Sequence, residues 1–149
     1  MGRVRVSVRA LLLNDDDELI VFRREVPGRG VYYSAPGGKI DPGEDDETAL
    51  RRELFEELGA TVGDLRHLFT ADGTADFPTA HRFYVTRLLS MDISQRTGAE
   101  FHNPAKGTYD VEQIPCQSKA LRAFHWVPQE LAIYLQKNGD TLPLLAPRG

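Results

Sequence analysis

The feature that most constrains this chain is a run of glycine and proline that leads directly into a strong helix pattern. Residues 36–43 read Pro-Gly-Gly-Lys-Ile-Asp-Pro-Gly, which no regular helix accommodates. Asp45 or Asp46 can then cap a helix whose first turn is acidic, and Gly59 stands where helices favour a terminating glycine. The sequence therefore predicts a shaped loop followed by a helix over residues 46–58.

One side of this helix gathers negative charge. At about 100° per residue, Glu53, Glu56 and Glu57 fall in one sector about 100° wide, beside a stripe of leucines that would anchor the helix on a sheet. Each like-charge pair costs an isolated helix roughly 0.2 to 0.5 kcal/mol. A hard divalent cation such as Mg²⁺ would reverse this cost, because it binds carboxylate oxygens. The helix is therefore a candidate metal site.

The alternative interpretation is an ordinary solvated helix face. Arg52 would then pair with Glu56 and Arg51 with Glu47, each pair one turn apart. Charge runs on helices are more often surface than site, so the helix alone leaves both interpretations open. The glycine-rich loop just upstream favours the site, because its backbone groups can reach the same carboxylates.

The rest of the chain has the patterns of a sheet with further helical cover. Alternation and β-branched residues mark the strands, and Gly, Pro and Asp mark the turns. The long polar connection is expected to close over or flank a substrate, because its length has no evident structural need. The patterns predict strands over 3–12, 18–22, 61–69 and 81–89, a loop over 25–30, a polar connection over 91–119 with one short strand at 108–114, and a helix between Pro128 and Gly139.

Length and composition limit the class of protein. With 149 residues, 41% hydrophobic and 27% charged, we expect one globular domain over 1–149, as a monomer or homodimer. The net charge of −4 disfavours a binder of long nucleic acid. The chain has one cysteine, Cys116, and no long apolar run, so we expect a reduced, cytoplasmic protein without membrane contact.

The spacing from Gly38 to Ala60 resembles a known family motif. Gly38 is followed by five residues and Glu44, then by seven residues and Arg-Glu-Leu-Phe-Glu-Glu-Leu-Gly-Ala at 52–60. This matches the Nudix box, G-x5-E-x7-R-E-U-x-E-E-x-G-U, in which U is a bulky aliphatic residue. Ala60 is smaller than the usual last residue, a departure that bears on packing alone. The chain is therefore similar to Nudix hydrolases.

The resemblance implies a fold, a reaction and a cofactor. The fold would be α/β, a Nudix-like α/β/α sandwich with a mixed β-sheet. The reaction would be hydrolysis of a diphosphate bond, by water attack at phosphorus, in a nucleoside diphosphate derivative or a nucleoside triphosphate. The cofactor would be Mg²⁺, with Mn²⁺ as a substitute. The resemblance assigns the metal to three carboxylates and one carbonyl, those of Glu53, Glu56, Glu57 and Gly38.

Two further box residues, Glu44 and Arg52, would orient these glutamates, since the guanidinium fork suits that task. Divalent ions would neutralise the diphosphate and acidify a bound water, whose proton a glutamate then takes. Glu53 is the first choice for this base. Glu100, in the long connection, is a later candidate, for which the simpler alternative is an exposed loop acid.

Four residues are candidates for substrate binding. Arg23 and Arg24 end the second predicted strand, Lys39 lies within the box, and Tyr33 is one of several aromatic residues that could stack on a base. Each has an alternative as an ordinary exposed or core residue.

Two other functions remain open: a Nudix-fold module that senses a nucleotide without cleaving it, and an RNA 5′-pyrophosphohydrolase. The intact glutamates disfavour the first, and the acidic balance disfavours the second. A small-molecule nucleotide is the expected partner.

Overall fold

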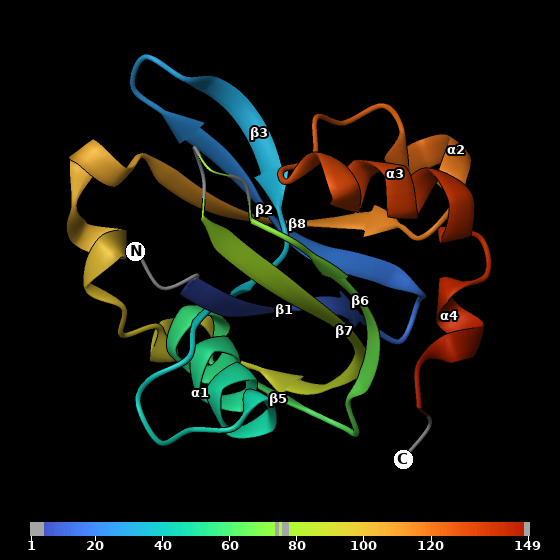
Figure 1. Ribbon diagram of the computed structural model, residues 1–149, viewed down its shortest axis with the longest axis horizontal. Coiled ribbons are helices and arrows are strands. Elements are labelled where there is room, and N and C mark those ends of the chain that lie inside the picture. The colour runs from blue at the N-terminus through green and yellow to red at the C-terminus, as the bar shows by residue number, and fades with distance from the viewer. Residues whose placement is uncertain (1–4, 74, 76–77, 148–149) are drawn as a thin grey trace.

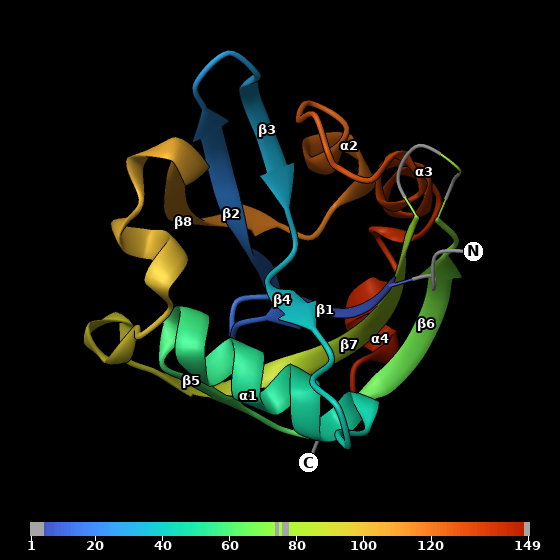
Figure 2. The same ribbon diagram turned by 60° about the vertical axis from the view of Figure 1, so that its left-hand side comes forward.

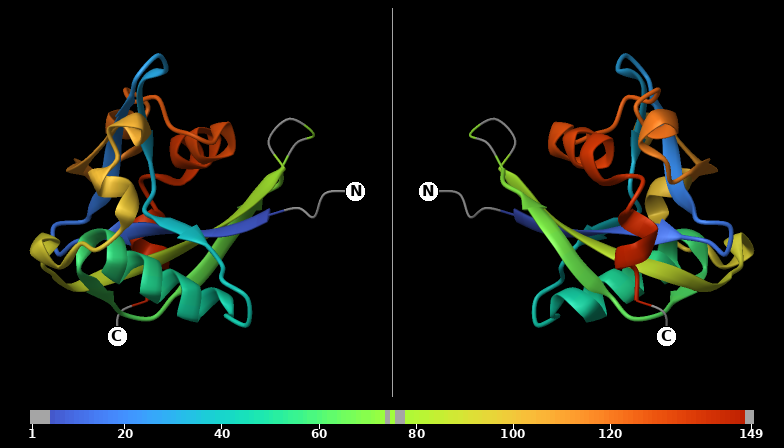
Figure 3. Two further views of the ribbon diagram at one scale, coloured as in Figure 1. Left: turned by 90° about the vertical axis from the view of Figure 1, so that its left-hand side faces the viewer. Right: turned by 90° about the vertical axis from the view of Figure 1, so that its right-hand side faces the viewer.

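In the computed structural model, which describes residues 5–73, 75 and 78–147, a mixed β-sheet lies between helices on its two faces (Figures 1 and 3). Helix α1 (Asp46–Leu58) covers one face. The shorter helices α2 (Ser118–Leu121), α3 (Gln129–Asn138) and α4 (Leu142–Leu145) cover the other. The α/β sandwich expected from the sequence is confirmed.

The central strand is β1 (Arg5–Leu13), which pairs in parallel with β7 (Thr79–Met91) and antiparallel with two others. The main path through the sheet is β3-β2-β1-β7-β5, while β4, β6 and β8 pair with β1, β7 and β2 respectively. In the described residues the sheet has eight strands. Besides β1 and β7, they are β2 (Glu18–Val26), β3 (Gly30–Ser34), β4 (Gly37–Lys39), β5 (Ala60–Val62), β6 (Arg66–Ala71) and β8 (Thr108–Pro115).

Side chains on β1 alternate between the two faces of the sheet, so the strand contributes to two separate hydrophobic cores. Val8, Ala10 and Leu12 pack toward α1, whereas Leu11 and Leu13 pack toward α3 and α4. All five are at most 1% exposed. Each leucine buried in this way contributes roughly 1.5 to 3 kcal/mol relative to an exposed one.

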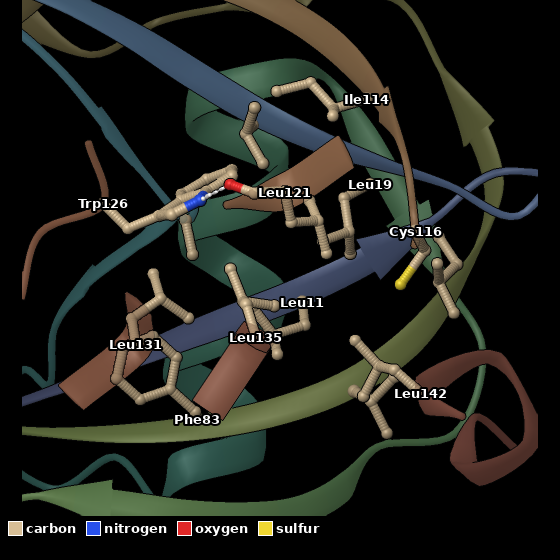
Figure 4. Close-up of a cluster of buried hydrophobic side chains, with 14 of the residues drawn as sticks. Leu11, Leu19, Phe83, Ile114, Cys116, Leu121, Trp126, Leu131, Leu135 and Leu142 are labelled. Carbon is tan, nitrogen blue, oxygen red and sulfur yellow. Dashed lines mark hydrogen bonds between the residues drawn. The ribbon is translucent and has the colours of Figure 1, made fainter. Parts of the chain in front are cut away.

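The core between the sheet and helices α3 and α4 contains the indole of Trp126, whose Nε1–H donates to the Leu121 carbonyl at 2.7 Å (Figure 4). Cys116 is also buried there, and its thiol donates to the Gly139 carbonyl. Burial raises the pKa of this thiol to about 12, so Cys116 is a packed residue rather than a nucleophile.

Several predicted boundaries need correction. The loop predicted over residues 36–43 is wrong for residues 37–39, which form β4 against β1. The loop over 25–30 is shorter, because β2 extends to Val26 and pairs with β3. The single strand over 61–69 is two short strands, β5 and β6, that pair with different parts of β7.

Other predictions are confirmed. The strand over residues 3–12 is present from residue 5 onward, and residues 3–4 lie outside the described part. The helix over 46–58 and the strand near 108–114 are present, and α3 begins directly after Pro128. In the described part of the chain, no helix combines the length and the apolar character needed to cross a bilayer.

Candidate active site

Helix α1 is fixed at both ends and along one face. The Asp45 side chain accepts from the Thr48 N–H at 2.8 Å, and Gly59 ends the helix in the left-handed region. Leu50, Leu54 and Leu58 are at most 1% exposed beneath the sheet. The leucine stripe therefore holds the neighbouring carboxylates at the edge of the core, as the sequence predicts.

The glycines of the loop bring backbone against these carboxylates. The Gly37 N–H donates to Glu57 Oε1 at 2.7 Å. A Cβ on Gly38 would lie 2.6 Å from the Glu53 carboxyl carbon, and a Cβ on Gly37 would lie 2.0 Å from the Val8 carbonyl oxygen. Gly37 therefore requires the absence of a side chain, whereas Gly38 could carry one only if the Glu53 carboxyl moved away, which explains why the loop carries two glycines in succession.

Glu57 and Glu53 are not on a solvated helix face. Glu57 is 4% exposed and the Glu53 side chain is 15% exposed. Burial raises the pKa of Glu57 to about 8, against the opposing charge of Arg9. Burial likewise raises the pKa of Glu53, against the opposing charge of Arg52. Both carboxylates are held where a compensating cation would stabilise their charged forms.

Arg52 connects the loop to the helix carboxylates. Its Nε and Nη2 donate to the two oxygens of Glu44 at 2.8 and 2.9 Å, which lowers the pKa of Glu44. Its Nη1 lies 3.2 Å from oxygens of both Glu53 and Glu56. The ion pairs of the alternative interpretation, Arg52 with Glu56 and Arg51 with Glu47, are thus present beside the buried pair Glu53 and Glu57.

Glu53 and Glu57 border a hollow of about 720 Å³, which we call the main cleft, whereas Glu44, Arg52 and Glu56 are not among its lining residues. Its wall combines four basic and four acidic side chains, so it suits an anion held together with cations. Glu100 from the connection between β7 and β8 lies in this wall, and Lys39 enters it from β4. The main cleft is lined by Arg9, Arg24, Gly37, Gly38, Lys39, Asp41, Glu53, Glu57, Glu100, Asn103, Lys106 and Tyr109.

A smaller hollow of about 140 Å³, which we call the side cavity, shares Arg9 and Arg24 with the main cleft. His81 in its wall contacts Ser7 through a hydrogen bond of 2.5 Å, and burial lowers the pKa of His81 to about 4. The imidazole is therefore neutral at physiological pH. The side cavity is lined by Arg9, Arg24, Tyr32, Ser34, Ala35, His81, Phe83, Val127 and Pro128.

Two arginines fasten the connection between β7 and β8 beside the C-terminal end of α1 (Figure 2). Arg24 donates to the carbonyls of Thr108 and Lys106, and its guanidinium lies 3.6 Å from the centre of the Tyr109 ring. Arg96 donates to the Glu57 carbonyl at 2.8 Å and to that of Tyr109 at 3.2 Å. The connection thus flanks the main cleft, through short 3₁₀ turns at Ile93–Gln95, Ala99–His102 and Pro104–Lys106.

Arg23 and Tyr33, two of the predicted substrate-binding residues, are not brought to either hollow. They are cross-strand partners on β2 and β3, one residue out of phase with Arg24 and Tyr32. Arg23 lies near Glu25 and Asp110, and the Tyr33 ring packs at 4.8 Å from that of Phe124. Alternation along the strands therefore separates the adjacent arginines that sequence reasoning treated together.

Sequence reasoning missed Arg9 and His81. The available signal for Arg9 was its place in the alternating strand between two apolar residues, Val8 and Ala10, both of which are fully buried. His81 has no metal-ligand spacing in the sequence, and the cavity that it lines forms only through tertiary packing, so the sequence carried no signal for it.

The donor set fits a hard divalent cation, because carboxylates and backbone carbonyl oxygens are the ligands that Mg²⁺ prefers. Glu53, Glu57, Glu100 and Gly38 all border the main cleft. Within the described residues, however, no three acidic, His or Cys side chains converge closely enough to form a ready ligand set. Glu53 and Glu56 are paired with Arg52 instead, so cation binding would require their side chains to turn.

Comparison with known proteins agrees with this geometry. The NUDIX domain matches residues 3–144, which is nearly the whole chain. The chain belongs to the Nudix family. Among solved structures, an ADP compounds hydrolase has a TM-score of 0.70 at 22% identity, covering 92% of this chain and 73% of that one, so it supports the Nudix fold alone.

Curated Nudix relatives bear several names. A putative 8-oxo-dGTP diphosphatase of Bacillus subtilis strain 168 is 42% identical over 144 residues, covering 87% of this chain and 85% of the relative. Nucleoside triphosphatase NudI of Salmonella heidelberg is 30% identical over 162 residues, covering 99% and 98%. Nudix hydrolase 25 of Arabidopsis thaliana is 34% identical over 106 residues, and the chain spans 54% of its length.

Proposed function

We propose that this Nudix protein hydrolyses a diphosphate bond in a small nucleotide, in a reaction that depends on Mg²⁺ or Mn²⁺. The observation that carries this proposal is the pair of shielded carboxylates, Glu53 and Glu57, pressed against Gly37 and Gly38 at the wall of the main cleft. A solvated charged helix would not bury Glu57 to 4% exposure. Burial of these carboxylates is expected at a site where they bind cations together with phosphate oxygens.

Residues in the main cleft and beside it would have different roles in this reaction. Glu53, Glu56, Glu57 and the Gly38 carbonyl would hold the cations, which, when bound, neutralise the diphosphate and acidify a water. Glu53 is the proposed base for that water, because burial raises its pKa toward the range in which a carboxylate accepts protons well.

Other side chains in the main cleft or beside it have supporting tasks. Arg52, which spans Glu44, Glu53 and Glu56, orients the glutamates. Lys39 lies in the wall where it can contact departing phosphate oxygens. Glu100 faces the same hollow and is available as a further ligand or an alternative base.

The substrate proposed here is a nucleoside triphosphate. The side cavity adjoins the main cleft through Arg9 and Arg24, and its aromatic wall of Tyr32, Phe83 and His81 suits a planar base. Two relatives that cover most of this chain are named as a putative 8-oxo-dGTP diphosphatase and a nucleoside triphosphatase. We therefore place ordinary and 8-oxo-modified nucleoside triphosphates first among the substrates to test.

The test is a panel of nucleoside triphosphates and nucleoside diphosphate derivatives, with chromatographic analysis of products in Mg²⁺, in Mn²⁺ and in excess chelator. We expect turnover of at least one nucleotide with either cation and its loss in chelator. Full activity in chelator would contradict the metal site. Tight nucleotide binding without any turnover would identify a sensing module instead of an enzyme.

A further inference from the structure

We propose that Arg9 is a substrate-binding residue whose guanidinium contacts the phosphate that joins the nucleoside to the rest of the polyphosphate. This inference rests on the proposed function, because it requires a nucleotide that occupies both the side cavity and the main cleft. Arg9 lies in the wall of both hollows, at the point where such a nucleotide would pass from one to the other.

The position of Arg9 is set by the backbone around it. Val8 and Ala10, its neighbours on β1, are fully buried, and β1 pairs with β4 so that Arg9 lies opposite Gly37. Its Nη1 donates to the carbonyl oxygens of Gly37 at 3.1 Å and Ala35 at 3.3 Å. These contacts place the guanidinium where the two hollows meet.

The charge of Arg9 acts on both hollows. Burial raises the pKa of Glu57 and of Glu53 in the main cleft, and the charge of Arg9 partly opposes that rise. Burial lowers the pKa of His81 in the side cavity, and the charge of Arg9 adds to that lowering. A single cation that faces two carboxylates on one side and a neutral imidazole on the other suits an anionic group lying between them.

The guanidinium of Arg9 still has hydrogen-bond donors to offer. In the part of the chain that the structure describes, its hydrogen bonds involve Nη1 alone. The N–H groups of Nε and Nη2 are therefore available for phosphate oxygens, and the planar guanidinium can present two of them at once.

Arg24, which also borders both hollows, fits this role less well. Its Nε and Nη2 donate to the carbonyls of Thr108 and Lys106, and its planar face lies on the Tyr109 ring. Arg24 therefore fastens the chain that flanks the main cleft, whereas Arg9 keeps donors for a ligand.

The experiment compares binding of a nucleoside with binding of its monophosphate, so that it isolates the phosphate. The probes are deoxyguanosine and dGMP, or the equivalent pair for whichever nucleoside the substrate panel identifies, measured calorimetrically without divalent cations. We expect Arg9→Gln to weaken monophosphate binding about 10- to 100-fold, the loss of one or two charge-assisted hydrogen bonds, and to leave nucleoside binding unchanged. KM for the full substrate should rise by a similar factor.

Arg5→Gln is the matched control, because Arg5 lies four residues earlier on the same strand and is exposed. Equal losses for nucleoside and monophosphate would assign Arg9 a purely structural role and overturn the inference, as would binding equal to that of Arg5→Gln. If Arg9→Gln does not fold, NMR of the wild-type protein gives the test, with the Nε resonance of Arg9 assigned by comparison with Arg9→Lys. That resonance must shift when the monophosphate is added and must not shift when the nucleoside is added. A resonance unmoved by monophosphate would overturn the inference.

The two proposals can fail separately. A wild-type protein that turns over nucleotides and binds the monophosphate, while Arg9→Gln behaves like Arg5→Gln, removes the role of Arg9 alone. A wild-type protein that neither binds nor cleaves any nucleotide removes the proposed function and this inference with it.

Discussion

Replacing Gly38 with alanine should disable the site while leaving the fold intact. The new Cβ would lie 2.6 Å from the Glu53 carboxyl carbon and from one of its oxygens. Contacts of this kind are ordinary from 3.4 Å outward, so the Glu53 carboxyl must retreat by about 0.8 Å. Gly38 does not have a positive φ, and the group that must move is the end of a side chain, so the backbone can accept the alanine.

The expected effect follows from that displacement. A reacting group misplaced by about 1 Å can lower the rate about 10²-fold, so kcat should fall by about that factor. The cation concentration needed for half-maximal activity should also rise, because Glu53 is a proposed ligand. The assay is steady-state hydrolysis of the best substrate of the panel, with the cation titrated, alongside thermal unfolding.

Gly63→Ala provides the matched control, since among the described residues a Cβ there would meet only the Arg87 carbonyl oxygen at 3.8 Å, an ordinary contact. It should retain wild-type kcat. A folded Gly38→Ala protein with wild-type kcat and cation requirement would refute the reasoning, because Glu53 could then be displaced without consequence.

Three further predictions test individual residues. Glu53→Gln should lower kcat at least about 10²-fold in a folded protein, whereas Glu47→Gln, an exposed acid on the same helix, should not; equal rates would remove Glu53 as the base. Burial raises the pKa of Glu57 from 4.5 to about 8, so the folded protein is more stable when this carboxyl is neutral. This contribution to folding stability is present at low pH and is lost as the pH rises through about 8. In chelator, the wild-type Tm should therefore fall relative to that of Glu57→Gln between about pH 5 and about pH 9, and a pH-independent difference would contradict the burial argument. Gly37→Ala should prevent folding, visible as lost near-ultraviolet circular dichroism, because its Cβ would meet the Val8 carbonyl oxygen at 2.0 Å with φ at +141°; a native spectrum would contradict the close approach.

The sequence predicts the parts of this site that depend on local periodicity. Helix α1 was predictable because its cap, its leucine stripe and its terminating glycine all follow from spacing within one segment. The same spacing placed Glu53 and Glu57 together and carried the resemblance to the Nudix box. These features need no knowledge of what packs against the helix.

The parts that depend on tertiary pairing were not predictable. Residues 37–39 look like a loop because of their glycines, yet Gly37 is what allows β4 to approach β1, and Gly38 leaves room for the Glu53 carboxyl. The exposures of Glu57 and Glu56 differ widely although the residues are adjacent, because the sheet covers only one of them. Arg9 could not be placed from sequence, since its two hollows are built from strands far apart in the chain.

The most direct test of the central claim is hydrolysis in ¹⁸O-labelled water, with product exchange controlled. If water attacks phosphorus in the main cleft, mass spectrometry should find one ¹⁸O in a phosphate-bearing product, and the labelled product should form only with a divalent cation. In Glu53→Gln its rate of formation should fall with kcat. Label found only on a non-phosphate alcohol, or labelled phosphate formed at the full rate in chelator, would contradict the account.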